Sequence, residues 1–260
     1  MLTQCWTIAR KEVLDGLRDT RSLISAAMYA LMGPAVVCMV SIAIRGKDAQ
    51  SSTGVLIGMM SVFTLVAAFV GGISVAMDTL AGERERRSLV PLLMNPVSRA
   101  DVILGKWMAV SFFTTAGLAL NLAGFAVVFR VAGMRLAADL QTTLWMLVCG
   151  LLPLALMASA LELTISTACR AVKEAHTYLS SLVFLPMGAG MFLVFFPTSG
   201  AWRHVLPVVG QQWQLEQWMQ GGAIGAGPSL MLGWVTAAFT ACVLWIAANR
   251  LERDDVVYGS

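Results

Sequence analysis

The chain has few charged residues, only two histidines and no nucleotide-binding loop. Charged residues occupy 13% of its 260 positions, whereas 58% are hydrophobic and the mean hydropathy is +0.75. A water-soluble core of this size could not absorb so much apolar surface. A soluble fold is therefore excluded, and an integral membrane protein is predicted.

Residues that carry out catalysis or hold a cofactor are scarce. His176 and His204 fall on opposite sides of the expected membrane, so they cannot share a site. Gly46-Lys47 and Gly105-Lys106 both lack the upstream glycine and the following hydroxyl residue of a phosphate-binding loop. We expect no catalytic, metal or cofactor site in this chain, so work against a gradient must draw on a partner or a coupled ion.

Disulfide bonds and a cleaved leader are not expected either. The first 22 residues are polar and basic, so the first hydrophobic run should remain as a membrane anchor. None of the five cysteines falls in an expected outer loop, and their spacing is not that of metal ligands. They are expected to be small apolar fillers: Cys5, Cys38, Cys149, Cys169 and Cys242.

Six apolar windows of about 20 residues indicate six transmembrane helices. They are too long and too continuously apolar to be strands of an outer-membrane barrel. We therefore expect an all-α membrane protein in which residues 1–260 form one permease-like domain. The expected spans are residues 23–44, 54–77, 107–129, 143–166, 178–196 and 229–248.

The basic residues set the expected orientation. With the N-terminus inside, thirteen of the 18 lysines and arginines fall in cytoplasmic segments, which places both termini in the cytoplasm. Residues 4–21 combine apolar and charged positions at helical spacing, which favours an interfacial helix on the inner membrane surface over a solvated leader. The five outer bases are Arg45, Lys47, Arg130, Arg135 and Arg203.

Few polar residues lie within the spans. Glu162 is the one ionisable residue clearly inside a span, and such residues are usually functional, although a helix contact explains it as well. Asp78 lies at the inner end of the second span, within reach of water. Asn121 fits an interhelix hydrogen bond better than a ligand. Pro34 and Pro186 interrupt spans. Such prolines suit helices that must bend, and they occur equally as structural features without a function.

A charge-dense segment, residues 77–106, separates the second and third spans. Its charges cannot lie in hydrocarbon, so the whole segment is expected to face water on the cytoplasmic side. The charged residues are Asp78, Glu83, Arg84, Glu85, Arg86, Arg87, Arg99, Asp101 and Lys106.

The same segment contains signals for a short helix. Ser88 can cap it, Pro91 suits its first turn, and Asn95-Pro96 ends it. Ser98 and Asp101 have the spacing of a capping box for the following helix. The apolar face of the short helix would suit a groove on a cytoplasmic protein, and it consists of Leu89, Leu92 and Leu93.

The run Ala81-Gly-Glu-Arg-Glu-Arg-Arg-Ser-Leu-Val-Pro-Leu-Leu, followed by Gly105-Lys106, resembles the signature of type-2 ABC transporter permeases. Those proteins typically read Ala-Gly-Glu-Lys-Glu-Arg-Gly-Thr-Leu-Glu-x-Leu-Leu. The nearest branch is that of the sodium-efflux and multidrug-type permeases. Ile8–Glu12 resembles the N-terminal interfacial helix of the family, and Leu206–Gly221 resembles its segment before the last span.

The resemblance implies an exporter subunit in a bacterial inner membrane, with ATP and Mg²⁺ bound by a separate ABC-type ATPase subunit. It also implies pairing with a second permease subunit, identical or related, near Pro34 and Pro186, and short re-entrant helices within residues 201–227. Contacts with lipid are expected and contacts with nucleic acid are not. In the family, the segment after the second span is the coupling helix that contacts the ATPase. If this role applies to the matching positions here, the contacts would be Glu83, Arg84, Glu85, Arg86, Ser88, Leu89, Leu92 and Leu93.

The sequence departs from the family pattern in two places. Val90 replaces a frequent acid, which bears on how the coupling helix docks. Residues 45–53 leave only nine positions where many members carry a large outer domain, so the substrates of those members are a weak guide to the substrate of this chain. The spans offer no charged lining for a transport path, which slightly favours an amphiphilic or lipid-like cargo over a small hydrophilic ion. Two other interpretations stay open: an ion-coupled carrier that uses Glu162 and Asp78, and a membrane scaffold that does not transport.

Overall fold

The computed structural model describes residues 2–44, 49–88, 98–132, 140–195, 201–222 and 224–251. All regular secondary structure in these ranges is helical, as expected from the sequence. Five helical segments are long and apolar enough to cross a membrane, which agrees with a multi-pass membrane protein. They are Thr20–Ala43, Thr53–Glu85, Arg99–Val131, Leu140–Ala168 and Ala226–Leu251.

The N-terminal part begins with two helices separated at Asp19. The Asp19 carboxylate accepts hydrogen bonds from the backbone N–H of Arg21, at 3.2 Å, and from the Ser22 hydroxyl, and so caps the second helix. The next apolar helix is interrupted at Gly71-Gly72. The elements are α1 (Leu2–Arg18), α2 (Thr20–Ala43), α3 (Ala49–Val70), α4 (Ile73–Ala76), the π-helical η1 (Met77–Gly82) and α5 (Glu83–Glu85).

The rest of the chain adds two long central helices and a group of short ones. Its elements are α7 (Arg99–Ala132), α8 (Leu140–Trp145), the π-helical η2 (Met146–Leu151), α9 (Leu152–Ala168), α10 (Val172–Leu182), α11 (Phe184–Phe195), the 3₁₀ turn η3 (Ala201–His204), α12 (Val209–Met219) and α13 (Ala226–Leu251).

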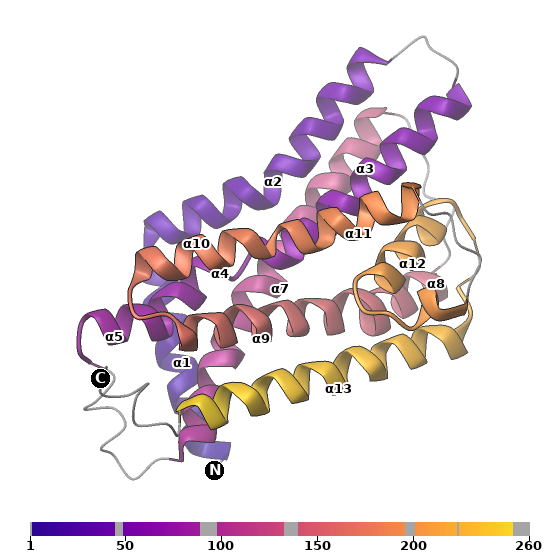
Figure 1. The fold of residues 1–260 in the computed structure, drawn as a ribbon. Helices are drawn as coiled ribbons and strands as arrows, with labels where there is room; N and C mark the ends of the chain where they lie inside the picture. Colours follow the sequence, from indigo (N-terminus) through magenta and orange to yellow (C-terminus); the bar gives the residue numbers. More distant parts are fainter. Residues whose placement is uncertain are drawn as a thin grey trace.

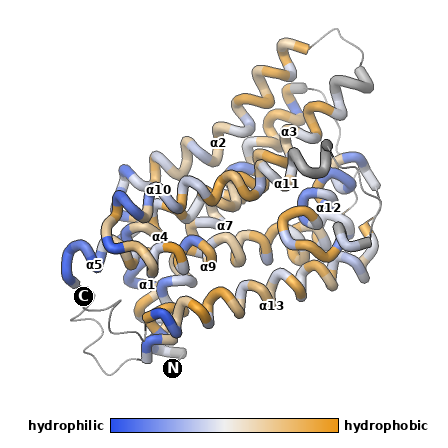
Figure 2. Tube along the Cα trace, in the orientation of Figure 1, coloured by the Kyte–Doolittle hydropathy of each residue, from blue (hydrophilic) through white to orange (hydrophobic). Residues whose placement is uncertain are grey.

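Helices α7 and α9 lie at the centre of the bundle. Helix α7 packs against α1, α2, α3, α9 and α13, and α13 covers the other side of α9 (Figure 1). The start of α1, the end of α13 and the charged turn α5 gather at one end of the bundle, whereas α12 lies at the other. The long helices between these ends are mostly hydrophobic (Figure 2). We call the end that holds α5 the α5 end.

The expected span at residues 178–196 differs from the structure. The region is two shorter helices, α10 and α11, joined at Val183, whose N–H bonds to the Ser180 carbonyl at 3.4 Å. Helix α10 exposes His176, Thr177 and Ser181. A hydropathy window averages over such polar positions and cannot detect a break between two helices.

Helices α2 and α7 make the interhelix contact that the sequence suggested. The Asn121 side-chain amide donates to the Ala30 carbonyl at 2.8 Å. One turn further along, Pro34 of α2 lies against Gly124 of α7, where a Cβ would come within 2.7 Å of the proline ring. The expected role of Asn121 as a helix contact is confirmed.

Helix α1 packs along the first turns of α7, and the two run in the same direction. Cys5 contacts Asp101, Ile8 lies opposite Gly105, and Gly16 lies against the ring of Phe113. A Cβ on Gly105 would stand 2.8 Å from Ile8 Cβ and 2.9 Å from the Cys5 carbonyl oxygen. The close approach of α1 therefore requires a glycine at position 105.

We predict that Gly105→Ala destabilises the protein by about 1–3 kcal/mol because the added methyl group overpacks this contact. Thermal unfolding of the detergent-purified chain measures the effect. Gly58→Ala is the matched control, since nothing lies within 4 Å of a Cβ there, and alanine should stabilise that helix by up to about 1 kcal/mol. Equal unfolding temperatures for the two variants would contradict the packing.

Candidate functional site

The side chain of Lys106 lies at the centre of a buried polar cluster at the α5 end. It is completely buried, and its Nζ lies 2.9 Å from Glu83 Oε1 and 3.1 Å from Glu12 Oε1. Nζ also donates to the Thr79 carbonyl at 2.6 Å. One ammonium group thus joins α7 to α1, η1 and α5.

A buried ammonium group is stable only when its protons have acceptors, and here three oxygens from three elements supply them. Gly105 lets the backbone of α1 approach, so Glu12 can reach the next residue of α7. The Gly105-Lys106 pair therefore acts as a unit: the glycine provides the close approach, and the lysine provides the ionic tie. We call Glu12, Thr79, Glu83 and Lys106 the Lys106 cluster.

The charged side chains of α5 bind the neighbouring helices. The Arg84 guanidinium donates to the Cys169 carbonyl at 2.6 Å and to the Thr167 carbonyl at 3.0 Å, which satisfies the free end of α9. Glu85 accepts the Val172 N–H at 2.8 Å at the start of α10. Helix α5 is thereby fixed to both helices.

The residues that follow α5 are more exposed. Arg86 pairs with Asp78, and both side chains are largely in solvent. Arg87 has a φ of 58°, and the Ser88 hydroxyl donates to the Glu83 carbonyl at 3.2 Å. Leu89, Leu92, Leu93 and the expected short helix lie outside the described residues.

The first turn of α7 has one of the two hydrogen bonds of the predicted capping box. The Asp101 N–H donates to Ser98 Oγ at 3.0 Å, and the Asp101 carboxylate accepts a hydrogen bond from the Cys5 thiol at 3.1 Å. Burial, together with the Asp101 carboxylate, raises the pKa of the Cys5 thiol. Cys5 is thus a buried donor that helps to hold α1 on α7.

The expectation that all charges between residues 77 and 106 face water was wrong for two of them. Lys106 is fully buried and Asp101 is 3% exposed. Both have partners on α1, which lies far away in the sequence. A charged residue can leave water when the fold supplies its counter-charge or hydrogen-bond partner, and the local sequence does not show that partner.

Glu162 lies deeper in the bundle. It is completely buried, and both of its carboxylate oxygens are without a hydrogen-bond partner among the described residues. Its carboxylate and the Thr114 hydroxyl both approach Gly72, at the break between α3 and α4, where a Cβ would collide with them. Irregular backbone at this depth is typical of functional or hinge positions.

Glu162 belongs to a buried polar stripe on α9. The Ser159 and Ser111 hydroxyls hydrogen-bond at 2.8 Å, and Ser166 Oγ accepts the Ala81 N–H at 3.2 Å. The stripe therefore holds α9 against α7 at one end and against η1 at the other.

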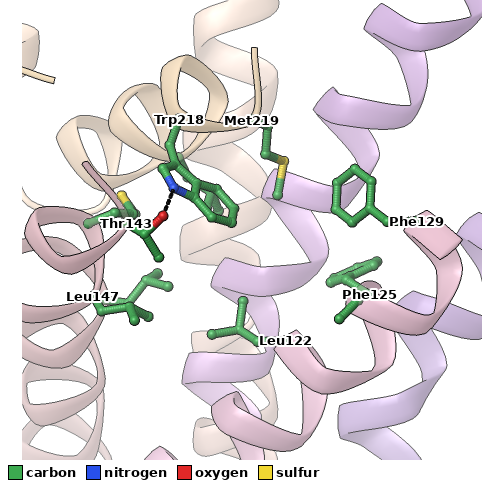
Figure 3. A pocket seen from close by; sticks show the side chains of 11 residues that line it. Leu122, Phe125, Phe129, Thr143, Leu147, Trp218 and Met219 are labelled. Atoms are coloured by element: carbon green, nitrogen blue, oxygen red, sulfur yellow. Dashed lines mark hydrogen bonds between the residues drawn. The ribbon is translucent and has the colours of Figure 1, made fainter. Parts of the chain in front are cut away.

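A cavity of about 200 Å³ lies at the far end of the bundle, between α7, η2 and α12 (Figure 3). Its walls include Leu122, Phe125 and Phe129, and the Trp218 indole N–H donates to the Thr143 hydroxyl at 3.0 Å beside it. Such an apolar cavity has no groups for catalysis. Among the described residues, no three histidine, cysteine or acidic side chains cluster closely enough to hold a metal ion.

Pro34 and Pro186 lie in different helices, α2 and α11, and both are buried. Met32 and Met187, each close in sequence to one of these prolines, line a cavity between α2 and α10–α11. The two helices thus border one cavity, but neither proline is among the residues that line it.

Sequence reasoning missed Lys106, Glu12 and Thr79 as site residues. The signal was present in part: Gly105-Lys106 and Ile8–Glu12 both belong to the recognised pattern, but nothing in the sequence pairs them. Thr79 contributes a backbone carbonyl, which any residue has. The sequence therefore contains no direct indication of its role.

The chain matches the model of the family described as "ABC-2 family transporter protein" over residues 6–218. It is 35% identical over 162 residues to the ABC transporter permease protein NatB of Bacillus subtilis (strain 168), which covers 58% of this chain and 42% of that protein. It is 26% identical over 137 residues to the probable ABC transporter permease protein NosY of Stutzerimonas stutzeri, covering 52% and 49%. The chain thus spans less than half the length of these curated relatives.

We predict that Lys106→Met destabilises the chain by about 3–5 kcal/mol, because Glu12 and Glu83 lose their buried counter-charge. Lys11→Met is the control: Lys11 is exposed and lies 3.7 Å from Glu12, so its loss should change stability by less than about 0.5 kcal/mol. Thermal unfolding in detergent measures both. Adding Glu12→Gln and Glu83→Gln to Lys106→Met should restore most of the loss, and no recovery would argue against the cluster.

Proposed function

This chain belongs to the ABC-2 family of transporter proteins, and from that premise we propose that it is the membrane-spanning permease subunit of an ATP-driven exporter. A separate ATPase subunit docks on residues 78–106 and hydrolyses the ATP. The observation that carries this proposal is the anchoring of α5, because a segment that receives force must be fixed to the helices that it moves.

The contacts of α5 provide a path for that force. Lys106 links α5 to α7 and α1, Arg84 links it to the end of α9, and Glu85 links it to the start of α10. A displacement at the ATPase then moves these helices together. The break at Gly71-Gly72 lets the segment from α4 to α5 change its angle relative to α3.

The expected ATPase contacts divide into two groups in this proposal. Glu83, Arg84 and Glu85 bind within the chain and hold the segment in place. Arg86 and Ser88 are exposed and face outward toward the partner. The apolar face of Leu89, Leu92 and Leu93 enters the groove of the ATPase.

In the membrane, α10 and α11 together form the fifth of six crossings, so both termini and the α5 end lie on the cytoplasmic side of the inner membrane. Helix α1 lies near the inner surface, and α12 is the re-entrant element on the outer side. A second permease subunit, identical or related, packs on α2 and α10–α11, near Pro34 and Pro186. ATP and Mg²⁺ bind to the ATPase partner.

We predict that an ATPase co-purifies with this chain from native membranes and that Leu92→Asp with Leu93→Asp abolishes this association. Charges on the docking face cannot be buried in an apolar groove without a large loss of affinity. ATPase activity in the eluate measures the association. Leu136→Asp, in the expected outer loop, is the control and should leave it intact. Absence of ATPase activity with the wild-type chain would overturn the proposal.

A second prediction concerns the crossing formed by α10 and α11. In a cysteine-free background, Arg170→Cys should react with a membrane-impermeant maleimide only from the cytoplasmic side, and Ser199→Cys only from the outer side. Right-side-out and inverted vesicles provide the two sides. If α10 and α11 do not cross the membrane, the two cysteines will react from the same side.

One observation favours a second candidate function. The buried carboxylate of Glu162, which has no hydrogen-bond partner within the described part of the chain, is the kind of group that ion-coupled carriers use. An ion-coupled carrier would transport without ATP and would stop in the presence of an uncoupler. Transport by reconstituted vesicles, with ATP or with an ion gradient as the only energy source, distinguishes the two functions.

A further inference from the structure

The apolar cavity at the far end of the bundle is bounded by side chains from α7, η2 and α12 (Figure 3). We call it the α7–α12 cavity. Its volume is about 200 Å³, whereas a dry engineered cavity of roughly 150 Å³ already binds benzene or xenon. In Figure 3, Trp218 and Met219 of α12 lie across the cavity from Leu122 of α7. The space is therefore large enough to hold one apolar group.

The walls of the cavity exclude polar occupants. Among the described residues that line it, only Thr143 and Trp218 carry side-chain oxygen or nitrogen atoms, and the Trp218 indole N–H donates to the Thr143 hydroxyl at 3.0 Å. The one donor of the indole is thus already used. A buried water needs about two to four polar partners, which these walls do not offer. The lining therefore favours a hydrocarbon occupant.

The wall on α7 gives the cavity an elongated shape. Leu122, Phe125, Ala126 and Phe129 follow one face of this helix, at positions i, i+3, i+4 and i+7. The two ends of this row lie about 10 Å apart along the helix axis. A cavity of this volume beside such a wall suits a stretch of one linear hydrocarbon chain better than a bulky ring system.

The cavity opens on the surface of the bundle between α7 and η2. Two of its lining residues, Ala126 of α7 and Leu147 of η2, are exposed. The surface on which a second permease subunit is proposed to pack, α2 with α10–α11, contributes no residue to the cavity among those described. In a membrane, hydrocarbon surrounds the opening, so lipid chains are the apolar groups that reach it.

A positive charge lies next to this opening. Arg130 follows Ala126 by four residues on α7, so it lies one turn further along the same side of the helix, and it is exposed. No carboxylate in the described part of the chain is within ion-pair distance of its guanidinium. A guanidinium group binds phosphate oxygens well, and an arginine at the end of a span lies at the level of the lipid head groups.

We propose that the α7–α12 cavity holds one acyl chain of a phospholipid, whose phosphate group lies beside Arg130. The chain enters past Ala126 and Leu147 and fills the space between α12, α7 and η2, so the lipid joins these elements. This inference goes beyond the proposed function. It rests on that function only for the leaflet, which is the outer one when the α5 end faces the cytoplasm.

Photolabelling of the purified full-length chain in phosphatidylcholine nanodiscs tests this binding without any ATPase. The first probe is a phosphatidylcholine with a diazirine in one acyl chain, and the matched probe is a diacylglycerol with the same chains and no phosphate. We expect the phospholipid to form adducts on residues 122–129 and 146–151. The diacylglycerol should label the same residues about threefold less, as for the loss of one exposed charge pair.

Two pairs of tryptophan variants locate the chain. Ala126→Trp and Leu147→Trp each fill the opening and should lower the phospholipid adducts about tenfold, because the indole overpacks the space that the chain needs. The matched controls are Val127→Trp and Val148→Trp, on the next residues, which are 60% and 57% exposed and do not line the cavity. They should retain the adducts. The two plugs lie on separate helices, so one remains informative if the other fails to fold.

A further variant tests the head group. Arg130→Gln should reduce the phospholipid adducts about threefold and leave the diacylglycerol adducts unchanged, because only the phospholipid has a phosphate to lose. Arg250→Gln, which removes an exposed arginine at the α5 end, is the control and should change neither.

Other outcomes overturn the inference. Adducts that survive both plug variants would place the lipid on the outer surface of the helices. Equal labelling by the two probes would exclude recognition of the phosphate. Labelling by a diazirine derivative of decane, but not by the phospholipid, would identify a site for free apolar molecules. Labelling requires neither an ATPase nor a known orientation, so failure of the exporter proposal and failure of this one are separate results.

Discussion

The arrangement of the α5 end depends on one buried ammonium group. Lys106 has no contact with water, and its three acceptors come from α1, η1 and α5. A buried charge without partners is far costlier than any single packing defect, so these elements must stay together for Lys106 to remain buried. The ion pairs therefore fix geometry, and the apolar packing around them supplies stability.

That geometry separates the segment between the second and third spans into a fixed part and an exposed part. The polar groups of Glu83, Arg84 and Glu85 are directed at the chain itself, toward Lys106, the end of α9 and the start of α10. A charge-dense sequence is thus compatible with a rigid base, and the described residues that directly follow Glu85 (Arg86, Arg87 and Ser88) are exposed. A loop solvated along its whole length would transmit little force, because its ends could move independently.

The sequence was sufficient for the all-helical class, for the long apolar helices and for single contacts such as that of Asn121. These follow from hydropathy and from the need of a polar side chain in a span for a partner. It was insufficient for the break at Val183, which a hydropathy window cannot detect, and for the burial of Lys106 and Asp101. Their partners, Glu12 and Cys5, lie more than 90 positions away, and only the packing of α1 on α7 brings them together. Glu162 was recognised as unusual, but its position beside Gly72 depends on the same long-range packing.

The short segment formed by α4 and η1 connects the Lys106 cluster to the cavity between α2 and α10–α11. Ser74 and Met77 line this cavity, and Thr79, two residues further on, contributes its carbonyl to Lys106. Gly71-Gly72 separates this segment from α3, so it can turn without moving the rest of that helix. A displacement of α5 by an ATPase would therefore change the wall of this cavity directly. The Lys106 cluster and the cavity need no long pathway between them, because one stretch of fewer than two helical turns belongs to both.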